Sequence, residues 1–354
     1  MIPDHQRSNA TRGLRLLTFF GVMSVSACVA HAGLPLPIPV PPGRLIDLGG
    51  YKLHLNCMGR GNPTVVLSAG AGDFSFDWSL VQPKVARISR VCSYDRSGEA
   101  WSDLGPKPRT PEQEAYDLHR LLAAGGESGP FVLVGHSLGG MIVRLFAENY
   151  PKEAAGAILV DSFHEDSQLN VRGKLVRIRM QAKNRHVPLP RETVNAQDGL
   201  QPEEIKQIDA FIAQFLGKPQ IDPPFDRLPA DVQRMRLWAV SQRKHYAAAD
   251  DFLAEECAKL YEEDSRLEHP LGGLPLIVLS RSRDDYPPDV AVVLSKEHQQ
   301  QQLSLARLSR AGKLVIVPNS GHHIQIEQPD AVVAAIGEIT TAARRKELQR
   351  ILSK

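Results

Sequence analysis

The sequence predicts an α/β fold with a mostly parallel, eight-stranded sheet and helices on both of its faces. Short apolar segments rich in β-branched residues alternate with helical patterns, as in parallel strands joined by helical crossovers. The later strand segments are almost wholly apolar, which is typical of strands covered on both faces. With 354 residues, of which 42% are hydrophobic and 23% charged, the chain is long enough for one such domain with an insertion.

Outside residues 162–274, eight segments have strand character and helical patterns lie between them. The strand segments are residues 45–48, 51–57, 64–68, 90–94, 131–135, 157–161, 276–280 and 313–318. Gly49-Gly50 joins the first two and is a hairpin signal, so we expect an antiparallel edge there. The helical segments are residues 111–124, 138–150 and 329–341, and the basic residues 342–354 read as a solvated surface helix.

Residues 162–274 interrupt this alternation. They contain no good strand segment, but residues 203–215, 231–246 and 250–263 have helical patterns. An insertion of this kind after the sixth strand predicts a helical cap over the ligand crevice. The α/β core is then expected to consist of residues 45–161 and 275–354.

The N-terminus has the features of a secretory signal peptide over residues 1–32. Arg7, Arg12 and Arg15 precede or flank an apolar run, and Ala30-His31-Ala32 offers a cleavage site. We therefore expect a secreted or periplasmic protein, with residues 33–44 as a proline-rich linker. An uncleaved anchor is one alternative. The other is a lipoprotein anchored through Cys28, since residues 25–28 resemble a lipobox, and only then would we expect membrane contact.

Charge and cysteine content exclude some classes of protein. The formal net charge of +2 gives no reason to expect a nucleic-acid partner. Four cysteines without a CxxC pair do not predict a zinc site. In an exported protein a disulfide can persist, and Cys57 and Cys92 would form one if their strands are neighbours; the alternative is two separate buried thiols.

The most informative stretch is Gly135-His136-Ser137-Leu138-Gly139. It is a G-x-S-x-G motif placed directly after an apolar strand segment and before a helical one. A serine on such a sharp turn is exposed above the sheet, and the helix N-terminus favours developing negative charge nearby. Ser137 is therefore the predicted nucleophile, whereas His136 reads as a packing or pocket-lining residue; a Gly-Ser turn without chemistry is the alternative.

With this motif the sequence resembles the α/β-hydrolase superfamily, in its serine esterase and lipase-like branch. Residues 65–73, 94–102 and 320–322 match further family motifs, although Glu99-Ala100 stands where glycine is common. The resemblance extends from about residue 45 to residue 341, apart from the cap, and implies the strand order 1-2-4-3-5-6-7-8. That order makes the strands of Cys57 and Cys92 neighbours and so favours the disulfide.

The resemblance also implies a base and an acid. It places the catalytic histidine at His322, with His323 as the alternative. Asp284 and Asp161 both satisfy the chain order serine, acid, histidine. Asp284 is the first candidate for the acid because it follows a late strand at the usual spacing; Asp161, at the end of the strand after the nucleophile helix, is the second, and Asp285 the third.

The family further implies an oxyanion hole formed by the backbone N–H groups of Ala71 and Leu138. The sequence thus predicts an exported serine hydrolase that cleaves a small-molecule carboxylic ester through an acyl-enzyme, without metal or cofactor. Amides, thioesters and lactones are alternative substrates, but epoxide hydrolases and haloalkane dehalogenases generally use a carboxylate nucleophile. A peptidase with the same triad and a non-catalytic ligand receptor are the alternative functions.

Overall fold

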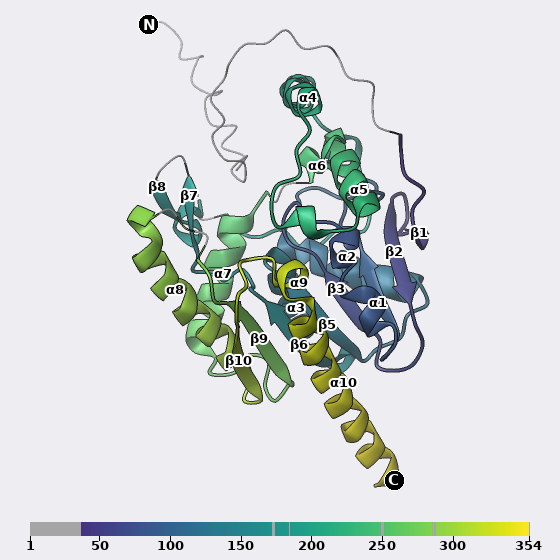
Figure 1. Ribbon diagram of the computed structural model, residues 1–354, viewed down its shortest axis with the longest axis vertical. Helices are drawn as coiled ribbons and strands as arrows, with labels where there is room; N and C mark the ends of the chain where they lie inside the picture. Colours follow the sequence, from purple (N-terminus) through teal and green to yellow (C-terminus); the bar gives the residue numbers. More distant parts are fainter. Residues whose placement is uncertain are drawn as a thin grey trace, which may run out of the picture.

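The computed structural model describes residues 37–353, except 172–173, 184, 249–250, 285 and 287. Its centre is an eight-stranded sheet with the strand order β1-β2-β4-β3-β5-β6-β9-β10 (Figure 1). The β1–β2 and β2–β4 pairs are antiparallel, and all pairs from β4–β3 onward are parallel. The predicted α/β fold and its strand order are confirmed.

Each predicted strand segment overlaps a strand of this sheet. The strands are β1 Arg44–Asp47, β2 Lys52–Met58, β3 Val65–Ser68, β4 Val91–Tyr94, β5 Phe131–His136, β6 Ala154–Val160, β9 Leu276–Arg281 and β10 Gly312–Val317. Gly49 and Gly50 form the β1–β2 turn with φ angles of 91° and 104°, which favour glycine. The predicted antiparallel edge is therefore confirmed, and its cause is the Gly-Gly turn.

Two apolar layers hold the sheet, one on each face. Neighbouring residues on one strand divide between them: Val66 packs with the layer of α2 and α3, whereas Val65 packs with the layer of α1 and α10. The helices of the core are α1 Gln82–Val85, α2 Pro111–Ala124, α3 Leu138–Asn149, α8 Pro288–Arg307, α9 Ile324–Glu327 and α10 Pro329–Leu352, with the 3-10 turns η1 Ser75–Trp78 and η2 Pro151–Glu153. Burial on both faces explains why the central strands are apolar throughout.

Helix α8 is absent from the sequence-based prediction. Its sequence contains four successive glutamines, Gln299 to Gln302, which weaken the amphipathic pattern. The topology nevertheless requires a crossover, because β9 and β10 are parallel neighbours and cannot be joined by a hairpin. Helix α8 is that crossover, and it packs against both strands.

The insertion after β6 is mainly helical, as predicted, and contains an unexpected hairpin. Its helices are α4 Pro202–Gly217, α5 Ala230–Val240, α6 Arg243–Ala247 and α7 Leu253–Arg266, with the 3-10 turns η3 Ile178–Gln181, η4 Ala196–Asp198 and η5 Phe225–Arg227. The expectation that this region has no strand is wrong, since β7 Gln168–Val171 and β8 Lys174–Arg177 pair antiparallel. A short two-stranded hairpin does not need the apolar run that marks a central strand.

The insertion has two parts with different positions (Figure 1). Helices α4, α5 and α6 group at one end of the sheet, and Val232 and Trp238 of α5 pack there against Phe74 and Trp101 of the core loops. Helix α7 instead packs beside α3, where Asp264 pairs with Arg144 at 2.5 Å. The first part thus lies over the loops that follow β3 and β4.

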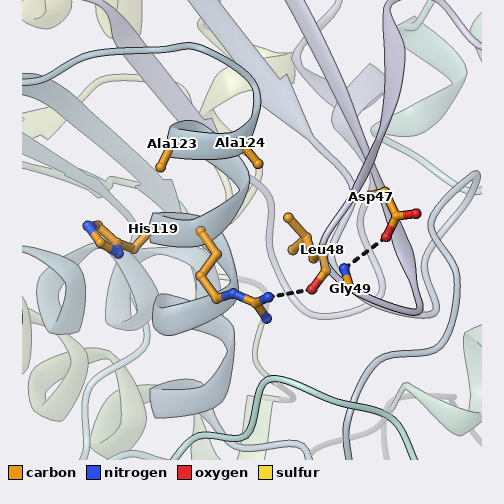
Figure 2. Close-up of a pocket in the computed structure, with 7 residues that line it drawn as sticks. Asp47, Leu48, Gly49, His119, Ala123 and Ala124 are labelled. Carbon is orange, nitrogen blue, oxygen red and sulfur yellow. Dashed lines mark hydrogen bonds between the residues drawn. The ribbon is translucent and has the colours of Figure 1, made fainter.

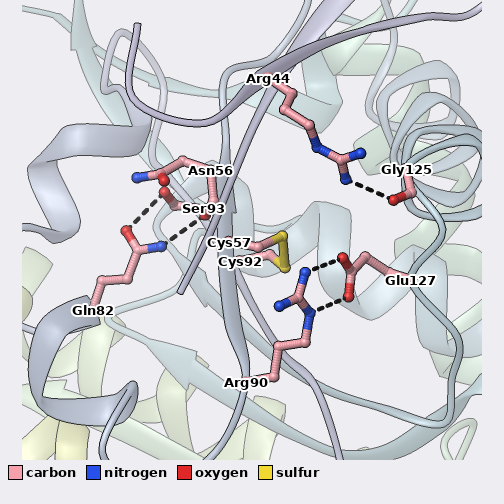
Figure 3. The surroundings of a disulfide bond; sticks show 9 residues. All are labelled: Arg44, Asn56, Cys57, Gln82, Arg90, Cys92, Ser93, Gly125 and Glu127. Atoms are coloured by element: carbon pink, nitrogen blue, oxygen red, sulfur yellow. Dashed lines mark hydrogen bonds and ion pairs between the residues drawn. A yellow bond between two sulfur atoms is a disulfide. The ribbon is translucent and has the colours of Figure 1, made fainter. Parts of the chain in front are cut away.

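The structure contains the Cys57–Cys92 disulfide (Figure 3). The two cysteines are directly opposite each other in the β2–β4 pair, so the antiparallel register brings them together. The ion pair between Arg90 and Glu127 lies beside it, with Nη2 and Oε1 2.6 Å apart. The disulfide therefore ties the antiparallel edge to the parallel part of the sheet.

Replacing both Cys57 and Cys92 by alanine is expected to destabilise the protein. The bond closes a loop with a sequence separation of 35 residues, and closing such a loop restricts the unfolded chain by about 4 kcal/mol. Urea unfolding of the oxidised protein and of the double variant should therefore differ by about 2–4 kcal/mol. The wild type kept in reductant is the control, and equal stability of all three samples would contradict the expectation.

The predicted signal peptide, residues 1–32, lies outside the described residues, as does Cys28. Within residues 37–353 as described, no helix combines the length and the apolar character needed to cross a membrane.

Candidate active site

The turn at Ser137 is sharp and sterically crowded. Ser137 follows β5, precedes α3 and has φ 50° and ψ −121°, a left-handed conformation that is unfavourable for a residue with a side chain. A Cβ atom on Gly135 would lie 2.2 Å from the carbonyl oxygen of Gly139, and one on Gly139 would lie 2.4 Å from that of Ser68. Both glycines of the motif are thus required for this turn to form against β3.

The Ser137 side chain is not used to cap the helix that it precedes. Serine at this position commonly accepts a hydrogen bond from the first turn of the helix. Here the N-cap residue Ser137 makes no such side-chain bond, and its side chain is half-buried. The Ser137 hydroxyl is thus not engaged in capping α3, as is expected of a nucleophile at such a turn.

His322 and Asp161 are hydrogen-bonded to each other beside this turn. His322 lies in the loop between β10 and α9, and its Nδ1 is 2.7 Å from Oδ2 of Asp161. Its ring centroid is 4.6 Å from that of His136, and its backbone oxygen is 3.0 Å from His136 Nε2. Since His136 immediately precedes Ser137, these contacts bring the His322 ring to the serine turn.

Asp161 lies at the carboxyl end of β6, next to Ser137 in the sheet. The backbone N–H of Ser137 donates to the carbonyl oxygen of Val160 at 3.1 Å. The backbone N–H of Asp161 donates to the carbonyl oxygen of Leu279 in β9 at 2.7 Å. Asp161 has φ 40°, a second left-handed residue at the same edge. Strands β5 and β6 are parallel neighbours, so Ser137 and Asp161, which follow their carboxyl ends, lie side by side.

The Asp161 carboxylate is buried and accepts several hydrogen bonds. Besides His322, it accepts from the backbone N–H and the Nη1 of Arg281, at 3.0 and 2.6 Å. His298 Nε2 of α8 lies 3.0 Å from Oδ1. Burial opposes ionisation, but hydrogen bonds from His298 and His322 and the charge of Arg281 outweigh it and hold the pKa of Asp161 well below its usual value. The carboxylate is therefore ionised.

The His322 imidazole has a lowered pKa. Burial lowers the pKa, whereas the hydrogen bond and the negative charge of Asp161 partly oppose this effect. The ring is therefore neutral near pH 7. Because Nδ1 donates to Asp161, the neutral ring has its lone pair on Nε2.

Asp284, the first candidate for the acid, has a different environment. It is exposed in the loop after β9, while His322 Nδ1 is bonded to Asp161. Asp285 lies outside the described residues. His323 Nε2 faces Asp73 instead of Asp161, at 3.6 Å from Oδ2. The structure thus brings Ser137, His322 and Asp161 to one place.

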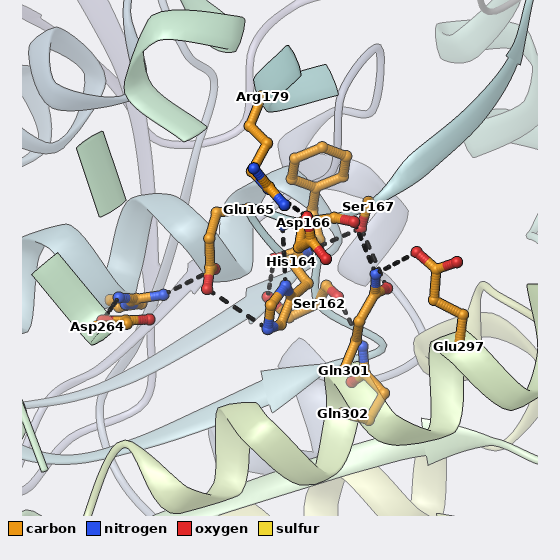
Figure 4. A network of polar contacts seen from close by, with 12 residues as sticks. Ser162, His164, Glu165, Asp166, Ser167, Arg179, Asp264, Glu297, Gln301 and Gln302 are labelled. Atoms are coloured by element: carbon orange, nitrogen blue, oxygen red, sulfur yellow. Dashed lines mark hydrogen bonds and ion pairs between the residues drawn. The ribbon is translucent and has the colours of Figure 1, made fainter. Parts of the chain in front are cut away.

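Helix α8 contacts Asp161 and holds the segment that follows it, which Figure 4 shows. Besides the contact of His298 with the carboxylate, Gln302 Nε2 donates to the carbonyl oxygen of Ser162 at 2.8 Å, and Gln301 Nε2 donates to that of Asp166 at 2.9 Å. The glutamines that obscured the helix in the sequence hold the segment that follows the aspartate.

The turn after β3 contains Ala71, one of the two candidate oxyanion donors. The buried guanidinium of Arg96 donates from Nη2 to the carbonyl oxygen of Gly70 at 2.7 Å and from Nη1 to that of Ala69. The Gly70–Ala71 peptide is trans, and in a trans peptide the carbonyl and the following N–H point in opposite directions. Arg96 therefore directs the Ala71 N–H away from itself.

Leu138, the other candidate donor, is the first residue of α3. Backbone N–H groups in the first turn of a helix have no partner within the helix. The structure thus places Leu138 at a helix N-terminus directly after Ser137, where the positive end of the helix dipole lies.

A polar cluster joins the turn after β3 to the insertion. Arg236 of α5 pairs through Nη2 with Oδ1 of Asp73 at 3.2 Å and through Nη1 with Asp77. His136 Nδ1 lies 3.2 Å from Oδ2 of Asp73. Burial lowers the pKa of His136 to about 4 and raises that of Asp77 to about 6. The Arg236 guanidinium thus contacts both buried carboxylates.

Two surface hollows lie away from this site. One of about 370 Å³ is between the β1–β2 turn and α2 and includes Leu48 and His119 in its lining (Figure 2). Another of about 280 Å³ includes Lys107 and Asp198. Neither is lined by Ser137, His322 or Asp161.

Three residues of the site have no signal in the sequence, namely Arg281, His298 and Arg236, and Asp73 lies in the motif of residues 65–73 without an expected role. Arg281 and His298 are isolated polar residues on late elements, and Asp73 and Arg236 meet only because α5 folds back over the turn after β3. His298 lies on the helix that was not predicted. Parallel strands at residues 276–281 and 312–317 require a helical crossover between them, and a search for that crossover could have found helix α8 and with it His298.

Comparison with known proteins places this geometry in a family. A model of the alpha/beta hydrolase family matches residues 65–335. "Probable transporter efuK" of Hormonema carpetanum is 24% identical over 325 residues, which cover 87% of this chain and 44% of that protein. An "AB hydrolase superfamily protein" of Gibberella zeae is 22% identical over 317 residues, covering 80% of this chain and 87% of that protein. The chain thus spans less than half the length of the first of these relatives.

Solved structures share the fold. A thermophilic esterase from Thermogutta terrifontis aligns with a TM-score of 0.55 at 22% identity, covering 83% of this chain and 94% of that one. The enol-lactonase from Burkholderia xenovorans LB400 aligns with a TM-score of 0.56 at 19% identity, covering 84% and 100%. Because the family model spans residues 65–335, well over half of the 354, the chain belongs to the alpha/beta hydrolase family.

Proposed function

We propose that this protein is a serine hydrolase that cleaves a carboxylic ester through an acyl-enzyme, with Ser137, His322 and Asp161 as its triad. The observation that carries the proposal is the 2.7 Å contact between His322 Nδ1 and Asp161 Oδ2 beside the Ser137 turn. In this assignment Asp161 takes the role for which Asp284 is the first candidate from sequence.

The proposed reaction starts with Ser137 Oγ attacking the ester carbonyl while His322 Nε2 takes the hydroxyl proton. The ionised Asp161 holds the ring in the required tautomer and stabilises the imidazolium that forms. His322 then gives the proton to the leaving alcohol, and an acyl-Ser137 remains. Water, deprotonated by His322, attacks this acyl group and releases the carboxylic acid, which regenerates the Ser137 hydroxyl.

The N–H groups of Leu138 and Ala71 are the proposed donors to the oxyanion. Leu138 supplies a helix N-terminal N–H next to the serine, and Arg96 fixes the orientation of the Ala71 peptide from behind. Preorganised donors of this kind stabilise the tetrahedral intermediate more than the ground state.

Arg96→Lys is therefore expected to lower kcat about 10–100-fold with a smaller change in KM, because loss of one oxyanion donor costs about 10²–10³-fold in kcat. Lysine keeps the charge but cannot bridge the carbonyl oxygens of Ala69 and Gly70 with a fixed fork. Steady-state kinetics on a p-nitrophenyl ester would measure this change. Arg90→Lys, in the ion pair with Glu127 beside the disulfide, is the matched control and should keep its kcat. A larger effect on KM than on kcat would contradict the positioning role.

Two further points support the choice of substrate and compartment. The fold neighbours described as an esterase and an enol-lactonase favour an ester or a lactone as the bond cleaved. Export of the protein remains a proposal based on residues 1–32, and the Cys57–Cys92 disulfide supports it because such bonds persist in oxidising compartments.

The test is covalent labelling of the folded protein with a fluorophosphonate. We expect one phosphonate per chain, located by mass spectrometry on the peptide that contains Ser137. A panel of p-nitrophenyl esters, lactones and peptide anilides then separates an esterase from a peptidase. The absence of labelling in folded protein would refute the hydrolase and favour a ligand receptor, and turnover of anilides alone would favour a peptidase.

A further inference from the structure

Three side chains next to the candidate active site converge on one point. Oδ2 of Asp73 lies 3.2 Å from His136 Nδ1 and 3.6 Å from His323 Nε2. The three atoms all lie within 4.8 Å of one another. Asp73 and His136 are buried and His323 is half-buried, so the cluster is largely shielded from solvent.

One nitrogen of the His136 ring lacks a hydrogen bond of good geometry. His136 Nε2 lies 3.0 Å from the backbone oxygen of His322, which can only accept, so Nε2 carries the proton. In the neutral ring Nδ1 then has a lone pair, and that lone pair faces the lone pairs of the Asp73 carboxylate. Nδ1 is among the buried polar atoms that have no hydrogen-bond partner. A divalent ion between the two groups would give both the nitrogen and the carboxylate oxygen a partner.

The local charges also favour a cation. Asp73 and Asp77 are both buried, and Arg236 contacts both of them. Arg236 approaches Asp73 through Oδ1, which leaves Oδ2 directed toward the two histidines. The Asp73 carboxylate therefore has one oxygen held by Arg236 and the other facing the imidazoles, where it can serve as a ligand.

The donor set, and the spacing of each histidine nitrogen from the carboxylate oxygen, fit a transition-metal site. Two imidazole nitrogens and one carboxylate oxygen are typical ligands of Zn²⁺ and similar divalent ions. With metal–ligand bonds of about 2.0–2.2 Å, tetrahedral ligand atoms lie about 3.4 Å apart. The separations of 3.2 and 3.6 Å are close to this value.

We propose that Asp73, His136 and His323 bind one divalent transition-metal ion of the Zn²⁺ class, with its fourth position open to water. His136 precedes Ser137, His323 follows His322, and Asp73 ends the turn that contains Ala71. The ion cross-links the three loops that carry the nucleophile, the base and one oxyanion donor. This role is structural and does not depend on the proposed hydrolysis.

The experiment measures metal binding directly. Untagged protein is stripped with EDTA, dialysed and titrated with Zn²⁺ by calorimetry, and Co²⁺ absorption reports the coordination. We expect one Zn²⁺ per chain and a higher Tm with the ion bound. His323→Ala and Asp73→Asn should each weaken binding about 100-fold or more, since even loss of a residue that only orients a ligand costs about 10–100-fold. His323 is the better first variant, because its side chain is half-buried and its removal leaves the core intact.

His119→Ala is the matched control, because His119 is a half-buried histidine that pairs with Glu153 on another part of the surface. This variant should bind Zn²⁺ as the wild type does. Binding of substantially less than one equivalent by the wild type, or unchanged binding by His323→Ala, would overturn the proposal. Fluorophosphonate labelling is read separately, so a failure of the metal site and a failure of the hydrolase are distinguishable.

Discussion

The variant Ser137→Ala is expected to lose about 10⁶-fold in kcat for ester hydrolysis, because removal of the nucleophile of such a triad costs about as much as removal of the whole triad. The residual rate would come from the oxyanion donors and from substrate binding alone. Folding should be retained, since the hydroxyl makes no cap bond and alanine keeps the Cβ that the turn already accommodates. Steady-state kinetics and the fluorophosphonate assay measure the two consequences, loss of turnover and loss of labelling.

Ser162→Ala is the matched control for Ser137→Ala. Ser162 directly follows Asp161, and its Oγ lies 3.5 Å from the backbone oxygen of Ser137, so it is a buried serine in the same place. Its hydroxyl also donates to the carbonyl oxygen of Phe163 at 3.2 Å. We expect Ser162→Ala to keep labelling and to stay within several-fold of the wild-type kcat. Labelling that survives in Ser137→Ala but disappears in Ser162→Ala would show that the nucleophile is misassigned.

The second large effect is expected for Asp161→Asn, with kcat lower by about 10⁴-fold, because an amide cannot hold the imidazole in the required tautomer or stabilise its charge. Asp161 Oδ2 accepts from His322 Nδ1 and from Arg281 Nη1. Loss of the negative charge also leaves the largely buried Arg281 without its ionic partner, and breaking a buried ion pair costs about 3–5 kcal/mol. Thermal melting must therefore accompany the kinetics.

Asp284→Asn separates the two candidate acids without this complication. Asp284 is exposed, so its replacement should leave the fold intact. If Asp161 is the acid, Asp284→Asn retains nearly all of the wild-type kcat. A drop of about 10⁴-fold in Asp284→Asn, in a protein that melts at the wild-type temperature, would restore Asp284 as the acid and remove Asp161 from the triad.

The fold could be predicted because its signals are local. Each central strand is apolar because both of its faces are covered. The two adjacent residues Gly49 and Gly50 are enough to predict the β1–β2 hairpin. The Ser137 turn is equally local, because Gly135 and Gly139 are needed within the same five residues. In contrast, α8 was missed because its glutamines hide the helical period, although the parallel β9–β10 pair requires a crossover.

The choice of acid could not be made in the same way. Asp161 and Asp284 follow neighbouring strands, β6 and β9, and both precede His322 in the chain. Either aspartate satisfies the chain order serine, acid, histidine and follows a strand at a suitable spacing. The backbone bond from Asp161 to Leu279 and the approach of the His322 loop decide which carboxylate lies under the imidazole.

The sequence by itself determined the Ser137 turn, which depends on residues close in the chain, whereas its resemblance to the family implied the strand order and so favoured the pairing of Cys57 with Cys92. Only the tertiary structure decided that Asp161 contacts His322, that Arg96 orients the Gly70–Ala71 peptide, and that Asp73 faces two histidines. These contacts join residues separated by tens to hundreds of positions. They are set by how loops from different strands meet at the carboxyl edge of the sheet, which no local pattern specifies.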